Sequence, residues 1–173
     1  YGKFGLVDTS LQHQLRDGKY QQRFEGGVRS ACFVKWPGVI GVGAVNQNIY
    51  SGVDLFTSFL QVAGAEMPTG RVIDGKPMLE SIISNKPVRN TFYAFAPQKE
   101  VQGVRYNNWK LVLDKRAGKN TLLLFDLATD AQEKNNIASA NQGIVDALYA
   151  LALRAQKAVE ENKPLLETNS FNF

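Results

Sequence analysis

The residues of this sequence that are best suited to chemistry gather in its first thirty positions. Three cations, Arg16, Lys19 and Arg23, lie there together with the only histidine, His13. Guanidinium and ammonium groups bind anions, and an imidazole with a pKa of about 6.5 can protonate a leaving group. The pattern predicts either a loop that binds an anionic substrate or, as base rates for chain ends favour, a solvated arm without chemistry.

A glycine pair, Gly26-Gly27, follows these cations and stands directly after Glu25. Glycine accepts a positive φ or lets the backbone pass close to another group. The mostly apolar run at residues 28–36 has the length of a strand and is stopped by Pro37-Gly38, so we expect a turn that leads into a buried strand. We expect Arg29 to pair with Glu25 or with another carboxylate at the strand end. Glu25, Gly26, Gly27 and Arg29 are accordingly predicted to form a structural turn that contains no catalytic acid.

Cys32 is the only cysteine of the chain, so no internal disulfide can form. Its place in the apolar run predicts a small buried side chain. No base stands beside it in the sequence, and we therefore expect a protonated, inert thiol.

Composition narrows the class of protein. A hydrophobic content of 44% and a charged content of 21% are those of a soluble globular domain. The net charge of +4 is spread along the chain without a five-residue basic run, and aromatic residues do not interleave with cations, which argues against a nucleic-acid-binding protein. No apolar stretch is long enough to span a bilayer. We expect neither a nucleic acid nor a membrane as a partner.

Helical periodicity marks the first half of the chain. At residues 53–63 the apolar side chains fall on one face of a helix; they are Leu55, Phe56, Phe59, Leu60 and Ala63. Ser51 or Asp54 can cap the start of this helix, and Gly64 can end it. The pattern changes from helical period to alternation at Asn85-Lys86-Pro87, which we take as a boundary between lobes.

Strand patterns fill the second half. Four short runs are rich in strand-forming residues, at positions 91–95, 101–106, 109–113 and 122–125. A helix predicted at residues 142–162 carries one apolar stripe, made of Ile144, Leu148, Leu151, Ala152, Ala155 and Val159. An antiparallel sheet with one face open needs such a cover. The sequence therefore predicts a four-stranded antiparallel sheet covered by the C-terminal helix.

The two halves differ in how complete a fold they can make. A lone buried strand needs neighbours on both edges for its backbone groups, and residues 1–87 offer none. We expect residues 1–87 to be the incomplete end of a larger α/β domain and residues 88–173 to be a small α+β subdomain. The chain begins at Tyr1, without an initiator Met or a signal peptide, which we interpret as the start of a processed or truncated product.

Five short motifs, in order, resemble those of the sulfatases, a family of alkaline-phosphatase-like hydrolases. They are Glu25-Gly26-Gly27-Val28-Arg29 with Trp36-Pro37-Gly38, the segment 51–57, Ala63-Gly64 with Asp74-Gly75, Val104-Arg105 with Trp109-Lys110-Leu111, and Phe125-Asp126-Leu127 with Asp130, Glu133 and Asn136. Each motif is short, but their common order and spacing extend over most of the chain. One departure is Ala31, which stands where the family usually has a proline.

The resemblance implies the end of an alkaline-phosphatase-like α/β sandwich, followed by the predicted sheet and helix, in an enzyme that hydrolyses sulfate esters. Sulfatases use a formylglycine nucleophile, made within a Cys/Ser-x-Pro-x-Arg motif, together with calcium or another divalent metal. Cys32 is followed by Phe33-Val34-Lys35 and lacks that motif, and the family's Asp-Asp and Asp-Asn metal-binding pairs are absent as well. The nucleophile and the metal ligands are therefore expected in a missing N-terminal part, the implied partner of this chain, which by itself is expected to be inactive and to hold no metal ligand.

Gly18-Lys19 resembles a Gly-Lys pair of the family whose lysine contacts the sulfate. It stands one residue further from Glu25 than the family spacing, so Arg16 or Arg23 can substitute, and His13 is a further candidate. Lys19 is thus the implied catalytic contact, and the other three are implied substrate-binding residues. The implied substrate is the sulfate ester of a small molecule or glycan, in a periplasmic, secreted or lysosomal compartment. The alternatives are a non-catalytic binding or scaffold module and a hydrolase of phosphate or phosphonate esters.

Overall fold

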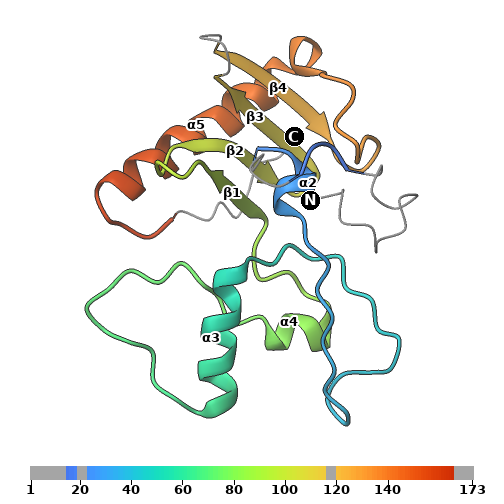
Figure 1. Ribbon diagram of the computed structural model, residues 1–173, viewed down its shortest axis with the longest axis vertical. Helices are drawn as coiled ribbons and strands as arrows, with labels where there is room; N and C mark the ends of the chain where they lie inside the picture. Colours follow the sequence, from blue (N-terminus) through green and yellow to red (C-terminus); the bar gives the residue numbers. More distant parts are fainter. Residues whose placement is uncertain (1–14, 19–22, 116–119, 166–173) are drawn as a thin grey trace.

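Four β-strands form one antiparallel sheet in the computed structural model, which describes residues 15–18, 23–115 and 120–165 (Figure 1). The strands follow one another across the sheet in the order of the sequence, as β1 (Thr91–Phe95), β2 (Val101–Tyr106), β3 (Trp109–Asp114) and β4 (Thr121–Asp126). Asn107 in the turn between β2 and β3 has a φ of 51°, a conformation that asparagine tolerates. The four predicted strands are confirmed.

One long helix, α5 (Gln142–Glu160), covers one face of this sheet. The register places one row of side chains across the four strands, and this row packs against α5; it consists of Tyr93, Val104, Leu111 and Leu124. The predicted stripe is confirmed, although its buried ends are Val145 and Ala158, while Ile144 and Val159 are only half-buried. A short 3-10 helix, η2 (Ala138–Ala140), precedes α5. No described helix has both the length and the apolar character that crossing a membrane requires.

The other face of the sheet is covered by residues from near the start of the chain. Phe24 is fully buried and packs with Val112 and Phe125 on this face, and the helical turn α2 (Glu25–Val28) follows it directly. Successive side chains of a strand point to opposite faces, so the residues beside the α5-facing row point toward α2. A segment distant in sequence therefore completes the cover of the sheet.

Two helices lie between α2 and β1, namely α3 (Gly52–Ala63) and α4 (Leu79–Ser84), joined by long loops. The predicted caps of α3 are present. Asp54 accepts a hydrogen bond from the backbone N–H of Ser51 at 2.7 Å, and Gly64 ends the helix with a φ of 63°. Both ends of α3 thus lie where the sequence places them.

The exposure of α3 is the reverse of that of an ordinary amphipathic helix. Its polar side chains Asp54, Thr57 and Ser58 are buried. Its apolar side chains face outward instead, and Phe56 and Phe59 are 47% and 66% exposed. No described residue covers this apolar face of α3.

The predicted strand at residues 28–36 is wrong. Val28 ends α2, and residues 29–36 form an irregular segment outside the sheet. Phe33 is 95% exposed, and Cys32, which we expected to be buried, is exposed as well. A single strand without neighbours would carry unpaired backbone groups into the interior. Within the described residues no second strand is available to pair with this one.

Candidate functional site

A buried lysine is at the centre of the polar contacts on the α2 side of the sheet. Lys110, on β3, is 2% exposed, and its Nζ lies 2.8 Å from Oε1 of Glu25 and 2.8 Å from Oε1 of Glu133. Alternation along β3 turns Lys110 away from α5, which its neighbour Leu111 faces. Arg105 is paired with Lys110 across β2 and β3, and its Nη1 lies 3.3 Å from Oε2 of Glu25. We call Glu25, Arg105, Lys110 and Glu133 the Lys110 cluster.

The Lys110 cluster joins two cations with two carboxylates, so its formal charges cancel. Burial raises the pKa of the Glu133 carboxyl, although the ion pair with Lys110 opposes this shift. Burial also lowers the pKa of Arg105, against the attraction of Glu25. Desolvation is the largest effect in both cases. A buried ion cluster of this kind contributes little net stability relative to apolar packing, so its more specific contribution is a fixed geometry.

Glu133 links the Lys110 cluster to the segment that precedes α2. Its φ of 54° lies in the left-handed region, which costs a residue with a side chain on the order of 1 kcal/mol. In this conformation its Oε2 accepts a hydrogen bond from the Glu25 backbone N–H at 2.7 Å, and its carbonyl oxygen accepts one from Nη1 of Arg16 at 2.8 Å. Asp130 supports the loop, because its carboxylate accepts the backbone N–H groups of the two residues after Glu133, at 3.1 and 2.8 Å.

Residues 15–18 are held against α2 as well. The Gly26 backbone N–H donates to the Arg16 carbonyl at 2.9 Å, and the Arg16 guanidinium lies 3.9 Å from the centroid of the Phe24 ring, a cation–π contact. A Cβ on Gly26 would lie 2.3 Å from the carbonyl oxygen of Asp17 and 2.5 Å from that of Arg16. Close approach of the backbone, and not a positive φ, is therefore what requires glycine at position 26.

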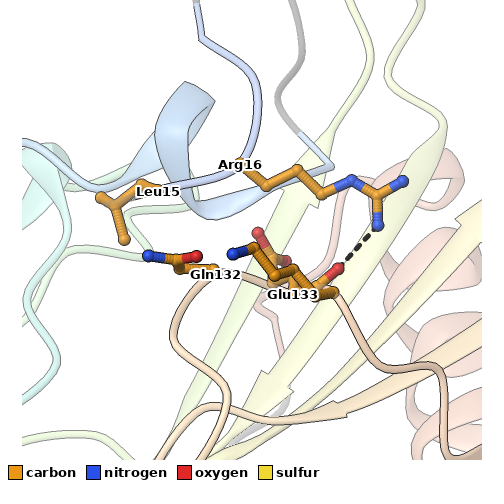
Figure 2. Close-up of a pocket in the computed structure, with 5 residues that line it drawn as sticks. Leu15, Arg16, Gln132 and Glu133 are labelled. Atoms are coloured by element: carbon orange, nitrogen blue, oxygen red, sulfur yellow. Dashed lines mark hydrogen bonds between the residues drawn. The ribbon is translucent and has the colours of Figure 1, made fainter. Parts of the chain in front are cut away.

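An open hollow of about 330 Å³ lies beside these contacts, lined by Leu15, Arg16, Gln132, Glu133 and Lys134. Figure 2 shows the Arg16 side chain reaching toward the Glu133 carbonyl, with Leu15 and Gln132 beside it. The lining contains the cations Arg16 and Lys134, an amide and the acidic residue Glu133, but no hydroxyl or thiol. The hollow can therefore receive a polar group.

The structure brings only part of the predicted cation site together. Arg16 contacts Phe24 and Glu133, and the guanidinium of Arg23 lies 5.6 Å from the centroid of the same Phe24 ring. Lys19 and His13 lie outside the described residues. The substrate-binding roles of these four residues stay predictions.

The expected pair between Glu25 and Arg29 is not formed. Glu25 and the glycine pair lie in α2, where the Arg29 backbone N–H donates to the Glu25 carbonyl at 2.7 Å, while the Arg29 side chain is exposed. Lys110 and Arg105 bind the Glu25 carboxylate instead. This contact draws the Glu25 side chain toward the sheet and away from the chain that follows α2.

The roles of Lys110 and Glu133 were missed in the sequence, where both residues entered only as parts of resembling motifs. A signal for Lys110 was present. It stands inside an apolar strand, in Trp109-Lys110-Leu111, and a buried ammonium requires a carboxylate partner. Nothing in the sequence indicated that Lys110 would have two carboxylate partners, Glu25 and Glu133, from distant parts of the chain.

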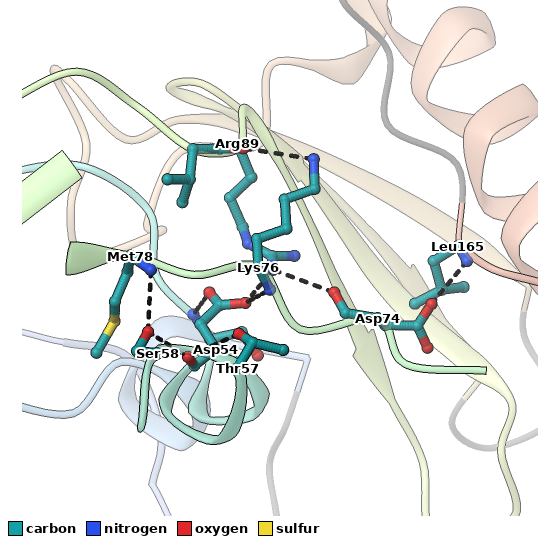
Figure 3. A network of polar contacts seen from close by, with 10 residues as sticks. Asp54, Thr57, Ser58, Asp74, Lys76, Met78, Arg89 and Leu165 are labelled. Atoms are coloured by element: carbon teal, nitrogen blue, oxygen red, sulfur yellow. Dashed lines mark hydrogen bonds and ion pairs between the residues drawn. The ribbon is translucent and has the colours of Figure 1, made fainter. Parts of the chain in front are cut away.

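A second buried polar cluster surrounds Asp54 (Figure 3). The Asp54 side chain is fully buried, forms an ion pair with Arg89 and accepts the Lys76 backbone N–H at 2.8 Å. Ser58 donates to the Asp54 carbonyl at 2.5 Å and accepts the Met78 backbone N–H at 2.9 Å. These contacts fasten α3 to the loop before α4 and to the chain entering β1. The Asp54 cluster thus explains why the polar side of α3 faces inward.

Neither cluster suits a metal ion or a nucleophile. Within residues 15–18, 23–115 and 120–165, no group of three or more His, Cys, Asp or Glu side chains could hold a metal. Cys32, the only thiol of the chain, is exposed on the irregular segment after α2. The described residues can orient a chain segment and present positive charge.

Comparison with known families gives the context of these motifs. A family model described as "N-sulphoglucosamine sulphohydrolase, C-terminal" matches residues 13–157. The chain belongs to this family. The matched range contains both clusters, the whole sheet and most of α5, and the chain is therefore a C-terminal portion of a sulfatase, as the motifs indicated.

Individual relatives agree with this assignment. The N-acetylgalactosamine-6-sulfatase of Sus scrofa is 28% identical over 177 residues, covering 83% of this chain and 33% of the relative. Among solved structures, the PsFucS1 sulfatase from Pseudoalteromonas sp. matches with a TM-score of 0.72 at 20% identity, covering 87% of this chain and 34% of that one. BT4656, in complex with its substrate D-glucosamine-2-N,6-O-disulfate, matches with a TM-score of 0.61 at 23% identity, covering 75% and 28%. The chain spans about a third of the length of these relatives and shares their fold.

Proposed function

We propose that this chain is the C-terminal part of an enzyme that hydrolyses sulfate esters through a formylglycine and calcium or another divalent metal, both held by an upstream part of the same polypeptide. A divalent metal activates a bound nucleophile and neutralises a tetrahedral anion. In this proposal residues 1–87 end the catalytic domain and residues 88–173 form a subdomain beside it. Lys19 contacts the sulfate, with Arg16, Arg23 and His13 near the substrate, in a periplasmic, secreted or lysosomal enzyme.

The family match over residues 13–157 carries the proposed activity, and the reversed exposure of α3 supports the proposed upstream part. An exposed apolar helix face that includes Phe56 and Phe59 is typical of a contact surface. The Asp54 cluster fixes the polar side of α3 inward, so the helix cannot turn over to bury its apolar side. A chain that spans about a third of its relatives leaves about two thirds of such a protein to supply the cover.

The proposed substrate class is a sulfated sugar. Its support is that one structural neighbour is described in complex with a glucosamine disulfate and that the relatives include an N-acetylgalactosamine-6-sulfatase. The hollow at Arg16 and Lys134, with two cations and the Gln132 amide, offers the donors that a sulfated sugar needs.

The test compares residues 1–173 alone with the protein that includes the upstream part, using an aryl sulfate and an aryl phosphate. We expect hydrolysis of the sulfate by the longer protein and none by residues 1–173, even with calcium. Phe59→Asp should reduce the activity of the longer protein by about 10-fold or more, because it puts a charge into the covered face. Leu153→Asp, at a residue of α5 that is 54% exposed, is the matched control and should leave the activity within about twofold.

Two results would contradict the proposal. Hydrolysis by residues 1–173 alone that is abolished by Cys32→Ala would place the nucleophile in this chain. Equal activity of the Phe59→Asp and Leu153→Asp proteins would show that the apolar face of α3 is not covered. If the longer protein prefers the aryl phosphate, the proposed arrangement of the two parts stands, but the substrate class changes from sulfate to phosphate esters.

A further inference from the structure

We propose that Glu133 is a positioning residue of the active site, which fixes residues 16–18 through the Lys110 cluster. The inference rests on the proposed sulfatase function for its consequence on rate. Its geometry rests on the described residues alone.

Glu133 contacts three separate parts of the chain at once. Its Oε1 lies 2.8 Å from Lys110 on β3, its Oε2 accepts the Glu25 backbone N–H in α2, and its carbonyl accepts Arg16. The contacts to Glu25 and Arg16 span 108 and 117 residues of sequence. One side chain and its own carbonyl therefore set the distance between the sheet, α2 and the segment before it.

These contacts are better explained by geometry than by stability. Glu133 is fully buried, has a left-handed backbone and carries a carboxyl whose pKa is raised by burial. Each of these features disfavours the folded state. An apolar side chain at this position would avoid the cost of burying a charge. What an apolar residue cannot do is direct one side-chain oxygen to the Lys110 ammonium and another to the Glu25 backbone N–H.

The segment that Glu133 fixes leads directly to the proposed catalytic contact. Residues 16–18 immediately precede Lys19 in the sequence. A displacement of 1 Å at a group that binds the reacting centre can lower the rate by about 10²-fold. Among described residues, Gly26 and Glu133 make the hydrogen bonds that hold Arg16 in place. Loosening Glu133 should therefore lower the rate before it prevents folding.

The test uses the protein that includes the upstream part. Glu133→Gln keeps an oxygen for the Glu25 N–H but removes the charge opposite Lys110, whereas Glu133→Ala removes both. Leu151→Ala is the matched control, since Leu151 is buried under the other face of the sheet and its truncation lowers the unfolding midpoint without touching the cluster. We measure kcat and KM on an aryl sulfate well below every unfolding midpoint, and amide hydrogen exchange at Gly26.

We expect kcat/KM to fall by about 10-fold in Glu133→Gln and by about 100-fold in Glu133→Ala, mostly through kcat. The kcat/KM of Leu151→Ala should stay within about twofold of that of the unaltered protein, although its unfolding midpoint falls by a comparable amount. Exchange of the Gly26 N–H, which is bonded to Arg16 at 2.9 Å, should accelerate by about 10-fold or more in Glu133→Ala and not in Leu151→Ala. If Glu133→Ala does not fold, Glu133→Gln tests the inference. Its Gly26 N–H should then exchange faster in proportion to its loss of kcat/KM.

Unchanged kcat and KM in folded Glu133 variants would overturn the inference, and so would unchanged Gly26 exchange. If the unaltered longer protein hydrolyses no sulfate ester, the proposed function fails on its own. The Gly26 exchange still decides in that case whether Glu133 holds residues 16–18.

Discussion

Replacing Gly26 by alanine tests whether α2 and residues 16–18 touch as closely as the structure shows. The added Cβ would lie 2.3 Å from the Asp17 carbonyl oxygen and 2.5 Å from that of Arg16, whereas ordinary contacts of carbon are about 3.5 Å or longer. Both oxygens belong to the backbone, so no side-chain rotation relieves the clash. The segment must retreat by about 1 Å, and the 2.9 Å hydrogen bond from Gly26 to Arg16 is lost.

The expected cost is a sum of three effects. The lost hydrogen bond costs about 1 kcal/mol, and the forced backbone shift costs about 1–3 kcal/mol. Alanine offsets roughly 0.8 kcal/mol through its helix propensity. We therefore expect Gly26→Ala to lower the free energy of unfolding by about 1–3 kcal/mol. Gly143, near the start of α5, has nothing within 4 Å of an added Cβ, so Gly143→Ala should be neutral or stabilising by up to about 0.8 kcal/mol.

Urea unfolding of the two variants, followed by circular dichroism, measures this difference. The same chemical change should produce opposite shifts of the midpoint. A Gly26→Ala protein as stable as the Gly143→Ala protein would refute the close contact between α2 and residues 16–18.

Three further predictions concern the clusters and the core. Leu148→Asp puts an unpaired charge into the fully buried contact of α5 with the sheet and should cost about 3 kcal/mol or more; an unchanged urea midpoint would mean that α5 packs elsewhere. Asp54→Asn leaves Arg89 without its buried anion and should lower the free energy of unfolding by about 3 kcal/mol. Lys115→Ala breaks an exposed ion pair and should lower it by less than about 0.5 kcal/mol. Equal losses of stability in thermal unfolding would contradict this ranking. Burial raises the folded-state pKa of Glu133, so its carboxyl contributes stability below the unfolded pKa of about 4.3 and loses that contribution as the pH rises through the folded value. The stability of the unaltered protein relative to Glu133→Gln should therefore decline from pH 4 toward pH 7, and a relative stability that rises over this range would refute the direction.

The sequence predicted the sheet and α5 well because both are determined by local patterns. Each strand of the sheet pairs with its neighbour in sequence. The apolar stripe of α5 around Leu148 needs only one face of that sheet to pack against. The strand predicted at residues 28–36 failed for the opposite reason. An apolar run indicates burial but not the partner that provides it, and no described strand lies where it could pair with this one.

The candidate site was predictable in its residue types but not in its contacts. Glu25 and the glycine pair stood out in the sequence, yet their partners Lys110 and Glu133 lie 85 and 108 residues away. Pairings of that length leave no periodic signal. Arg29, the nearest cation after Glu25, was the natural local choice of partner, and the structure replaces it with a lysine from the middle of the sheet.

The long reach of the Lys110 cluster also orders the events of synthesis. Glu25 leaves the ribosome 108 residues before Glu133, an interval of about 5–20 s at about 5–20 residues per second. For most of that interval, until β4 ends at Asp126, Phe24 and Glu25 have no completed sheet to contact. The hairpins of β1 to β4 pair locally and can form as soon as they emerge. Phe24 and Glu25 are therefore made well before their partners. The Phe24 ring is available to chaperones until β4 is complete, and the Glu25 N–H has no carboxylate to bind until residue 133 appears.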